Sequence, residues 1–169
     1  MPKKKRVAEV RRSARELAMQ LLYSLEIRPK QNLDECLNAF TKWGFASNVS
    51  MDEATQNYMI FLVRGVWSAR TDIDDMMRRI VVGWRLERMV SVDRAVLRVA
   101  IFEGFLNKEV PVAVAISEAV ELASAFGTED SSRFVNGVLA KVLRFMSSEG
   151  TSHNDKNPAV STSKDSADS

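Results

Sequence analysis

The sequence is 169 residues long, with 46% apolar and 27% charged residues, proportions typical of one folded domain and not of a chain disordered throughout. A single cysteine, Cys36, and a single histidine, His153, exclude an intrachain disulfide, a thiolate-rich metal site and histidine-based catalysis. Neither glycine motif that commonly cradles nucleotide phosphates occurs, so we expect no cofactor. The basic N-terminus is followed by more charge and no stretch is apolar enough to span a membrane, so we expect a cytoplasmic protein.

Positive charge is concentrated at the N-terminus, although the formal net charge of the chain is only +2. Among the first fifteen residues a single acid, Glu9, accompanies seven basic residues: Lys3, Lys4, Lys5, Arg6, Arg11, Arg12 and Arg15. Such a cluster favours a polyanionic ligand, because lysine and arginine release counterions when they meet phosphates. A solvated terminus is the alternative, and the run from Pro2 to Val7 also has the form of a weak nuclear-import signal.

Apolar residues recur at three- and four-residue spacing from about residue 9 to about residue 146. The pattern predicts an all-α domain of about seven helices over residues 9–146, between a basic extension (residues 1–8) and a disordered polar tail (residues 147–169). The expected helices cover residues 9–27, 33–44, 50–70, 71–82, 91–107, 111–126 and 130–146. The run from Ala95 to Phe102 is apolar nearly all round, so the fifth helix should be central. The first helix should bury a stripe formed by Ala14, Leu17, Ala18, Leu21 and Leu25.

Helix boundaries follow from residues that favour helix ends. Ser50, followed three residues later by a glutamate, predicts a capping box, and Thr71 and Ser91 predict the starts of two later helices. Pro111 suits the first position of a helix, where its missing N–H costs nothing. Gly127 suits the left-handed position that often follows a helix end.

One face of the first helix combines arginines with an aromatic ring. With Arg12 at zero and roughly 100° per residue, Tyr23 falls near about 20°. Arg15 falls near about −60° and Arg11 near about −100°, away from the apolar stripe centred at about 190°. Arginine makes forked phosphate contacts and a tyrosine ring can stack an unpaired base, so the face is typical of single-stranded RNA binding. An ordinary polar helix face is the alternative, which the acidic residues on the same side favour.

The segment from Phe126 to Leu139 predicts a second corner, where a loop meets a helix. Free N–H groups, Arg133 and the ring of Phe134 would lie near one another there, which suits an anion and a stacked base. From spacing alone, Phe134 is more simply interpreted as a core residue. Glu118 and Glu121 could form a catalytic pair, but their spacing on an amphipathic helix is typical of a solvated face.

Three stretches carry more specific motifs: Arg12 to Tyr23 (RSARELAMQLLY), Val92 to Ala100 (VDRAVLRVA) and Pro111 to Leu139. In the third, AVELA is followed by FG and then by FVNGVL. In this order and spacing they resemble the NusB family of bacterial transcription antitermination factors. The likeness covers about residues 9–146, although residues 28–56 match poorly and the tail has no counterpart.

The resemblance implies two small three-helix bundles and a protein that binds the single-stranded boxA element of ribosomal RNA leaders and catalyses no reaction. As partners it implies NusE, a small-subunit ribosomal protein, and the RNA polymerase antitermination complex. Matching by motif places the RNA contacts of the family on Arg11, Arg12, Arg15, Tyr23, Arg133 and Phe134. Asp93 and Asp130 match acidic positions around the RNA or partner surface. Ser13 stands where relatives often carry another basic residue, for which the upstream lysines could compensate.

Two other interpretations stay open. Related RNA-binding domains begin bacterial ribosomal RNA cytosine methyltransferases, although we expect 169 residues to leave no room for their catalytic domain. The other is a helical adaptor that binds only protein, with its basic end solvated. RNA binding that survives Arg12→Glu with Arg15→Glu unchanged would favour the adaptor and count against the arginine face of the first helix.

Overall fold

The computed structural model describes residues 3–28, 30–43, 51–83 and 85–152, and within these ranges all regular structure is helical. The elements are α1 (Lys3–Ile27), α2 (Leu33–Trp43), α3 (Glu53–Ile80), the 3-10 helix η1 (Leu86–Arg88), α4 (Ser91–Ala100), the π-helix η2 (Ile101–Leu106), α5 (Val112–Phe126) and α6 (Ser131–Ser152). The expected all-α class is confirmed, with six α-helices in the described ranges where about seven were expected. Ser50, Trp84 and most of the expected tail, from residue 153, lie outside the described residues.

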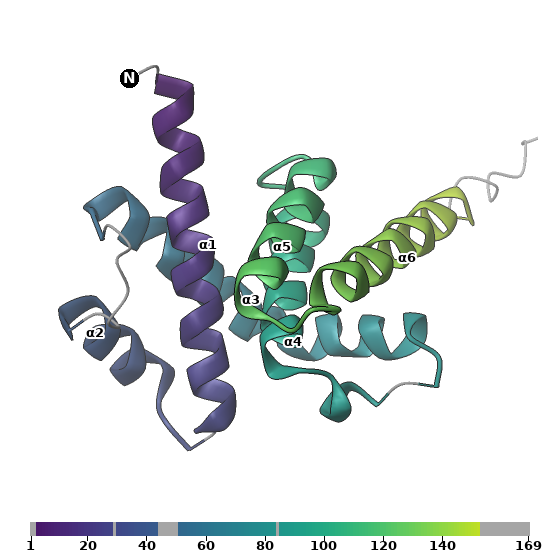
Figure 1. Cartoon of the computed structure of the whole chain (residues 1–169), viewed down its shortest axis with the longest axis horizontal. Coiled ribbons are helices and arrows are strands. Elements are labelled where there is room, and N and C mark those ends of the chain that lie inside the picture. Colours follow the sequence, from purple (N-terminus) through teal and green to yellow (C-terminus); the bar gives the residue numbers. More distant parts are fainter. Residues whose placement is uncertain (1–2, 29, 44–50, 84, 153–169) are drawn as a thin grey trace, which may run out of the picture.

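The helices form two groups that meet at α4 (Figure 1). In the first group α1 packs on α2 and α3, and in the second α4, α5 and α6 pack on one another. Because α1 and α3 also contact α4, this helix joins the two groups. Every residue from 93 to 105, through α4 into η2, is buried, which confirms the expected central helix. Ser91 is the first residue of that helix and not its cap.

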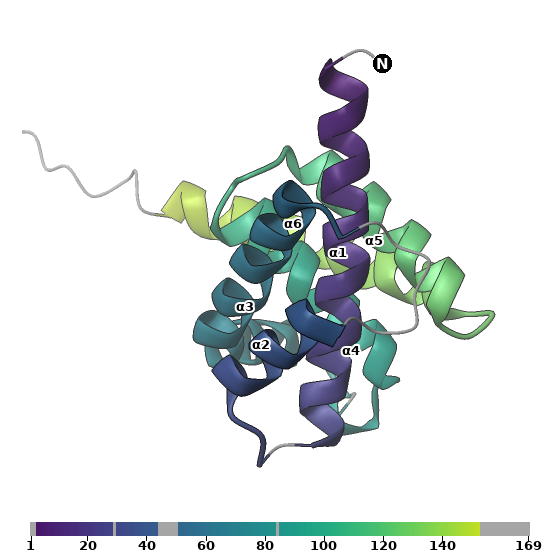
Figure 2. The ribbon, with the colours of Figure 1, turned by 90° about the vertical axis from the view of Figure 1, so that its left-hand side faces the viewer.

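α1 begins at Lys3, earlier than the expected start at residue 9. Its predicted stripe is buried, because Ala14, Leu17, Ala18, Leu21 and Leu25 are all at most 3% exposed. The first turns of α1 project beyond the rest of the described molecule in both views (Figures 1 and 2). Lys4, Lys5 and Arg6 are exposed on these turns. Most of the expected basic extension is therefore a continuation of α1, which holds its positive charge in a fixed direction.

α3 is a single helix of 28 residues where the sequence predicted two. Thr71 begins no helix, because no glycine or proline interrupts the chain there. Asp74, expected in the first turn of the second helix, instead pairs with the Arg98 guanidinium at 2.8 Å. The cap of α3 is Asp52, two residues after the predicted one, and its carboxylate accepts a hydrogen bond from the Thr55 N–H at 2.9 Å.

The ends of α5 differ from the prediction in detail. Pro111 immediately precedes the helix and is not its first residue, and Gly127 is extended, with φ −90° and ψ −158°, and not left-handed. Glycine is needed there for space, since a Cβ atom would lie 2.4 Å from Ser131 Oγ and 2.7 Å from the Ala123 carbonyl oxygen. Ser131 Oγ also accepts a hydrogen bond from the Thr128 N–H at 2.8 Å. This tight turn fixes how the end of α5 and the start of α6 lie together.

Candidate nucleic-acid interface

Arg11 and Arg12 form ion pairs with a row of carboxylates that runs from the end of η2 along α5. Arg11 Nη2 lies 3.0 Å from Glu109 Oε1. Arg12 Nη2 lies 3.1 Å from Glu118 Oε1 and 2.8 Å from Glu121 Oε2. The two arginine side chains are 30% and 57% exposed, so both can meet a ligand from solution. In the free protein, however, each guanidinium already has an acidic partner.

Arg15 is buried, so its expected place on the open face of α1 is wrong. Its side chain is 4% exposed, with Nε 2.7 Å from Glu103 Oε2 and Nη1 3.2 Å from Glu118 Oε2. Glu103, in η2, is completely buried and also accepts a hydrogen bond from the Tyr58 hydroxyl. Burial and this hydrogen bond raise the pKa of Tyr58, which keeps the phenol protonated as a donor. The helical wheel did not predict the burial of Arg15, because a wheel shows which residues lie outside the apolar stripe but not which neighbouring element covers them.

The arginine cluster of α1 is not basic once its partners are counted. Three guanidinium groups meet four carboxylates: Arg11, Arg12 and Arg15 against Glu103, Glu109, Glu118 and Glu121. Glu121 is exposed, as expected for a solvated face, but Glu118 is mostly covered and bonds two arginines. The unmatched positive charge of α1 therefore lies upstream, on its projecting first turns.

Tyr23 borders a surface hollow of about 400 Å³, which we call the tyrosine hollow. It is lined by Met19, Gln20, Tyr23, Ser24 and Ile27 of α1, by Arg28, by Val92 of α4 and by Phe126 of α5. The tyrosine is 37% exposed, in agreement with the helical wheel. It lies eleven residues beyond Arg12, or roughly 16 Å along the helix axis, so the ring and the carboxylate row are separate features of one helix.

A second hollow, of about 350 Å³, is lined by the four remaining predicted site residues; we call it the aspartate hollow. Arg133 and Phe134 come from the first turn of α6, Asp93 comes from α4, and Asp130 comes from the turn between α5 and α6. Arg88 of η1 lines it too and is exposed, as Arg133 is. No sequence motif marked Arg88, because only the fold brings η1 to this place.

Asp93 is a buried acid with an unsatisfied oxygen. It is only 3% exposed, so its side chain is covered in the free protein. Its Oδ1 has no hydrogen-bond partner among the described residues, while the Ser131 side chain hydrogen-bonds to the carboxylate. Burial raises the pKa of Asp93, and the Ser131 hydrogen bond opposes part of that rise. Asp93 lines the aspartate hollow, but this oxygen is shielded from solvent, so an N–H donor in the hollow reaches it only when the side chain turns toward the hollow.

The Asp93→Asn variant is expected to remove a pH-dependent cost of folding. Burial raises the pKa of Asp93 above its value in the unfolded chain, about 3.9, so the folded state loses stability as the pH rises through the folded pKa. An asparagine has no charge to desolvate. The difference in unfolding free energy should therefore shift in favour of the variant as the pH rises above about 4. Urea unfolding at several pH values measures this difference, and a constant difference would contradict the assignment.

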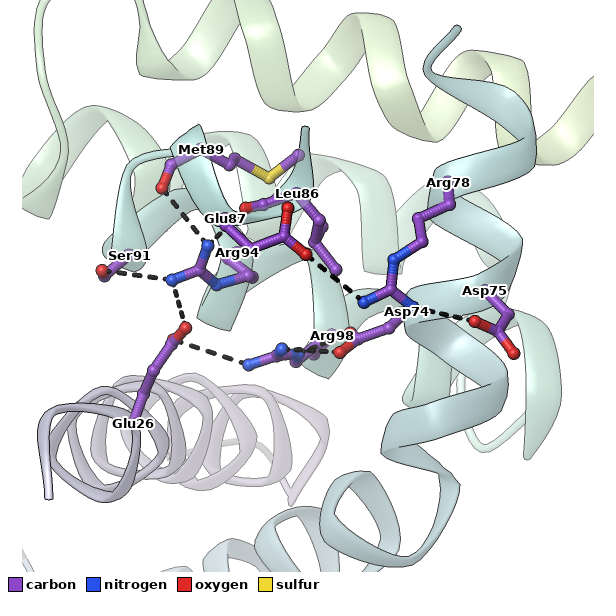
Figure 3. Close-up of polar contacts among 10 residues, drawn as sticks. All are labelled: Glu26, Asp74, Asp75, Arg78, Leu86, Glu87, Met89, Ser91, Arg94 and Arg98. Carbon is purple, nitrogen blue, oxygen red and sulfur yellow. Dashed lines mark hydrogen bonds and ion pairs between the residues drawn. The ribbon is translucent and has the colours of Figure 1, made fainter. Parts of the chain in front are cut away.

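A buried ion network holds the last turns of α1 against α4 and α3 (Figure 3). Glu26 pairs with Arg94 and, over 3.5 Å, with Arg98, which in turn makes a forked pair with Asp74 at 2.8 Å. Arg94 also donates to the Leu86 carbonyl oxygen. Sequence reasoning missed this network. Arg94 and Arg98 lie four residues apart in a helix that is apolar nearly all round, and arginines buried in such a helix need acidic partners. The network fixes the part of α1 that carries the tyrosine hollow.

The described part of the chain contains neither a metal-ligand cluster nor a membrane-spanning helix. No group of three or more histidine, cysteine or acidic side chains there is arranged to hold a metal ion. None of the described helices is long and apolar enough to cross a membrane.

Comparisons with known proteins find similarity along most of the chain. Residues 12–144 match the model of the NusB family. The transcription antitermination protein NusB of Symbiobacterium thermophilum is 43% identical over 139 residues, which cover 80% of this chain and 90% of the relative. The solved structure of T. maritima NusB superposes with a TM-score of 0.67 and 32% identity, over 79% of this chain and 90% of that one. A structure of the antitermination factors NusB and NusE with dsRNA gives a TM-score of 0.68 at 20% identity, over 80% of this chain and 97% of that one, which shows a shared fold.

Proposed function

This chain belongs to the NusB family of transcription antitermination proteins, and from that premise we propose that it binds the boxA element of ribosomal RNA leaders together with NusE. In this role it would join the RNA polymerase antitermination complex and promote full-length ribosomal RNA transcription. The structural observation that carries the proposal is that the two hollows are lined by consecutive residues in the first turn of α4. Val92 lines the tyrosine hollow and Asp93 the aspartate hollow, so aromatic and basic groups from α1, α5 and α6 gather around this turn.

The phosphate contacts are proposed to begin on the projecting turns of α1. Lys5, Arg12 and Tyr23 fall within about 20° of one another around the helix and span roughly 27 Å along it. Lys5 supplies an exposed positive charge, Arg11 and Arg12 supply forked phosphate contacts, and Tyr23 supplies a stacking surface. Arg15 acts differently from the expectation, because it positions α1 against η2 from inside and does not touch RNA.

The aspartate hollow is proposed to receive a base at the other end of the surface. Arg133 is exposed next to Phe134 in the chain, and Asp93 can accept an N–H from a base edge once its side chain turns toward the hollow. Asp130 is exposed on the turn above α6 and is proposed to meet either the RNA or NusE. The NusB fold has been solved with NusE and dsRNA in a relative, which supports the proposed pair of partners.

One observation favours the protein-only adaptor as a second candidate. The three arginines of α1 meet four carboxylates, so this cluster by itself does not attract a polyanion. RNA binding must therefore draw on Lys4, Lys5 and Arg6, on Arg28 and on the aspartate hollow, or it must replace carboxylates by phosphates.

Fluorescence anisotropy of a boxA-like single-stranded RNA and of its scrambled version, with and without NusE and at two salt concentrations, tests the proposal. We expect tighter binding of the boxA-like RNA, a gain from NusE, and a log–log salt slope near −0.7 for each phosphate contacted. Arg12→Gln should weaken binding, whereas Arg64→Gln should not. Arg64 is a matched control, because it is about as exposed as Arg12 and also pairs with an acid, Asp34. Equal binding of both RNAs, or binding of NusE alone, would favour the adaptor.

A further inference from the structure

The tyrosine hollow has a second aromatic wall that no motif marked. Phe126, the last residue of α5, is 40% exposed and lines the hollow with Tyr23 of α1. A ring exposed to that extent gains little from the protein core, and here it is held beside another exposed ring. Two aromatic rings bordering one concavity are typical of a site where an unstacked base is held.

The edge of the tyrosine hollow carries the polar groups that such a ligand needs. Gln20 and Ser24, one turn apart on α1, supply an amide and a hydroxyl that can donate to or accept from a base edge. Arg28, just past the end of α1, is exposed and forms no ion pair with any described carboxylate. It therefore differs from Arg11, Arg12 and Arg15 in being ready for a phosphate without displacing an acid.

The ion network of Figure 3 makes the tyrosine hollow rigid. Glu26 lies between Ser24 and Ile27 of the α1 wall and pairs with Arg94 and Arg98 of α4. The first turn of α4 supplies the Val92 wall. Ion pairs from Glu26 to the buried Arg94 and Arg98 thus tie both walls together, and a preformed site loses less conformational entropy when a ligand enters.

We propose that the tyrosine hollow takes one unstacked base of the single-stranded RNA, with Phe126 as a base-binding residue and Arg28 on a neighbouring phosphate. This inference rests on the proposed function and assigns a subsite to it. A base fits better than an apolar protein side chain, because the hollow combines two rings and a polar edge with an unpaired guanidinium. The tyrosine hollow also adjoins the aspartate hollow in the chain, because Val92 and Asp93 are consecutive residues of α4.

Substitutions at Phe126 test the stacking. Phe126→Leu keeps an apolar side chain but removes the ring, and we expect it to weaken binding of the boxA-like RNA on the order of 10-fold. Phe126→Trp keeps a stacking surface and should bind nearly as the parent does. Leu143→Ala is the matched control, because Leu143 on α6 is 42% exposed and lies outside both hollows. Arg28→Gln should lower the salt slope relative to Arg64→Gln.

An RNA series with one base removed at a time locates the subsite. At one position, the loss of binding free energy caused by removing the base and the loss caused by Phe126→Leu should not add, because both changes remove the same contact. If no position shows this coupling, or if Phe126→Leu binds RNA as Leu143→Ala does, the subsite is refuted. Loss of NusE binding alone would assign the hollow to protein and also refute it. If the parent binds boxA-like and scrambled RNA alike, the boxA proposal fails, but a coupled position would still support the base subsite.

Discussion

The Arg15→Met variant is expected to lose about 3–5 kcal/mol of unfolding free energy, because it leaves a buried charge without its cation. Glu103 is completely buried in η2, and its partners are the Arg15 guanidinium and the Tyr58 hydroxyl. With Arg15 removed, a single neutral donor would have to compensate an ionised carboxylate away from water. Urea unfolding followed by circular dichroism measures the loss.

Two further variants identify the cause of that loss. Arg12→Met removes a guanidinium that is 57% exposed and should cost at most about 1 kcal/mol. The double variant Arg15→Met with Glu103→Leu removes both charges, so it should recover much of the stability of the parent. If Arg15→Met unfolded at the same urea concentration as the parent, the pair with Glu103 would contribute nothing.

The burial of Arg15 changes how RNA-binding variants of α1 must be interpreted. A reversal to glutamate there would place a third carboxylate beside Glu103 and Glu118, and the protein would lose stability before any RNA contact was tested. Arg12→Glu with Arg15→Glu, the combination that the sequence suggests, therefore confounds folding with binding. Substitutions at Arg11, Arg12 and Lys5 report on RNA contacts, since all three side chains reach solvent.

Helix positions and the core could be predicted because they depend on local periodicity. The apolar stripe of α1 predicts which face of that helix is buried, and the run of α4, apolar nearly all round, predicts that the whole helix is buried. Helix ends were less predictable, since a capping residue competes with continued helix. Thr71 has the form of a cap, but the chain there continues the hydrogen-bond ladder of α3, and Asp74 is held by Arg98 of another helix.

The candidate site could be predicted only in part, for a related reason. Motifs brought together Arg133, Phe134, Asp93 and Asp130, and the fold places all four around the aspartate hollow. Which side chains lie open was not predictable, because exposure depends on elements distant in sequence. Arg15 is covered through a partner 88 residues away, and Glu118 and Glu121 meet Arg12 only after α5 packs near α1.

Replacing Glu118 and Glu121 with glutamine should strengthen RNA binding, because both carboxylates occupy the Arg12 guanidinium that a phosphate would use. The hydrogen bond and charge of Glu118, together with the charge of Glu121, raise the pKa of Arg12, so both carboxylates stabilise its charged form. A phosphate must compete with them in the parent but not in the variant. We expect a gain on the order of 3- to 10-fold at low salt, with Glu121→Gln alone giving the smaller part.

The gain must be separated from a simple change in net charge. Asp72→Asn with Asp75→Asn removes two exposed acids from α3 that line neither hollow, so it makes the same change in net charge without touching Arg12. It should leave affinity nearly unchanged at moderate salt, because charges beyond about 10 Å are largely screened. Adding Arg12→Gln to the Glu118 and Glu121 variant should abolish the gain, since the freed guanidinium is its cause. A freed guanidinium that gains a phosphate should also steepen the log–log salt slope by roughly 0.7. Equal gains in both double variants would mean that the carboxylate row acts only through net charge and does not compete for Arg12.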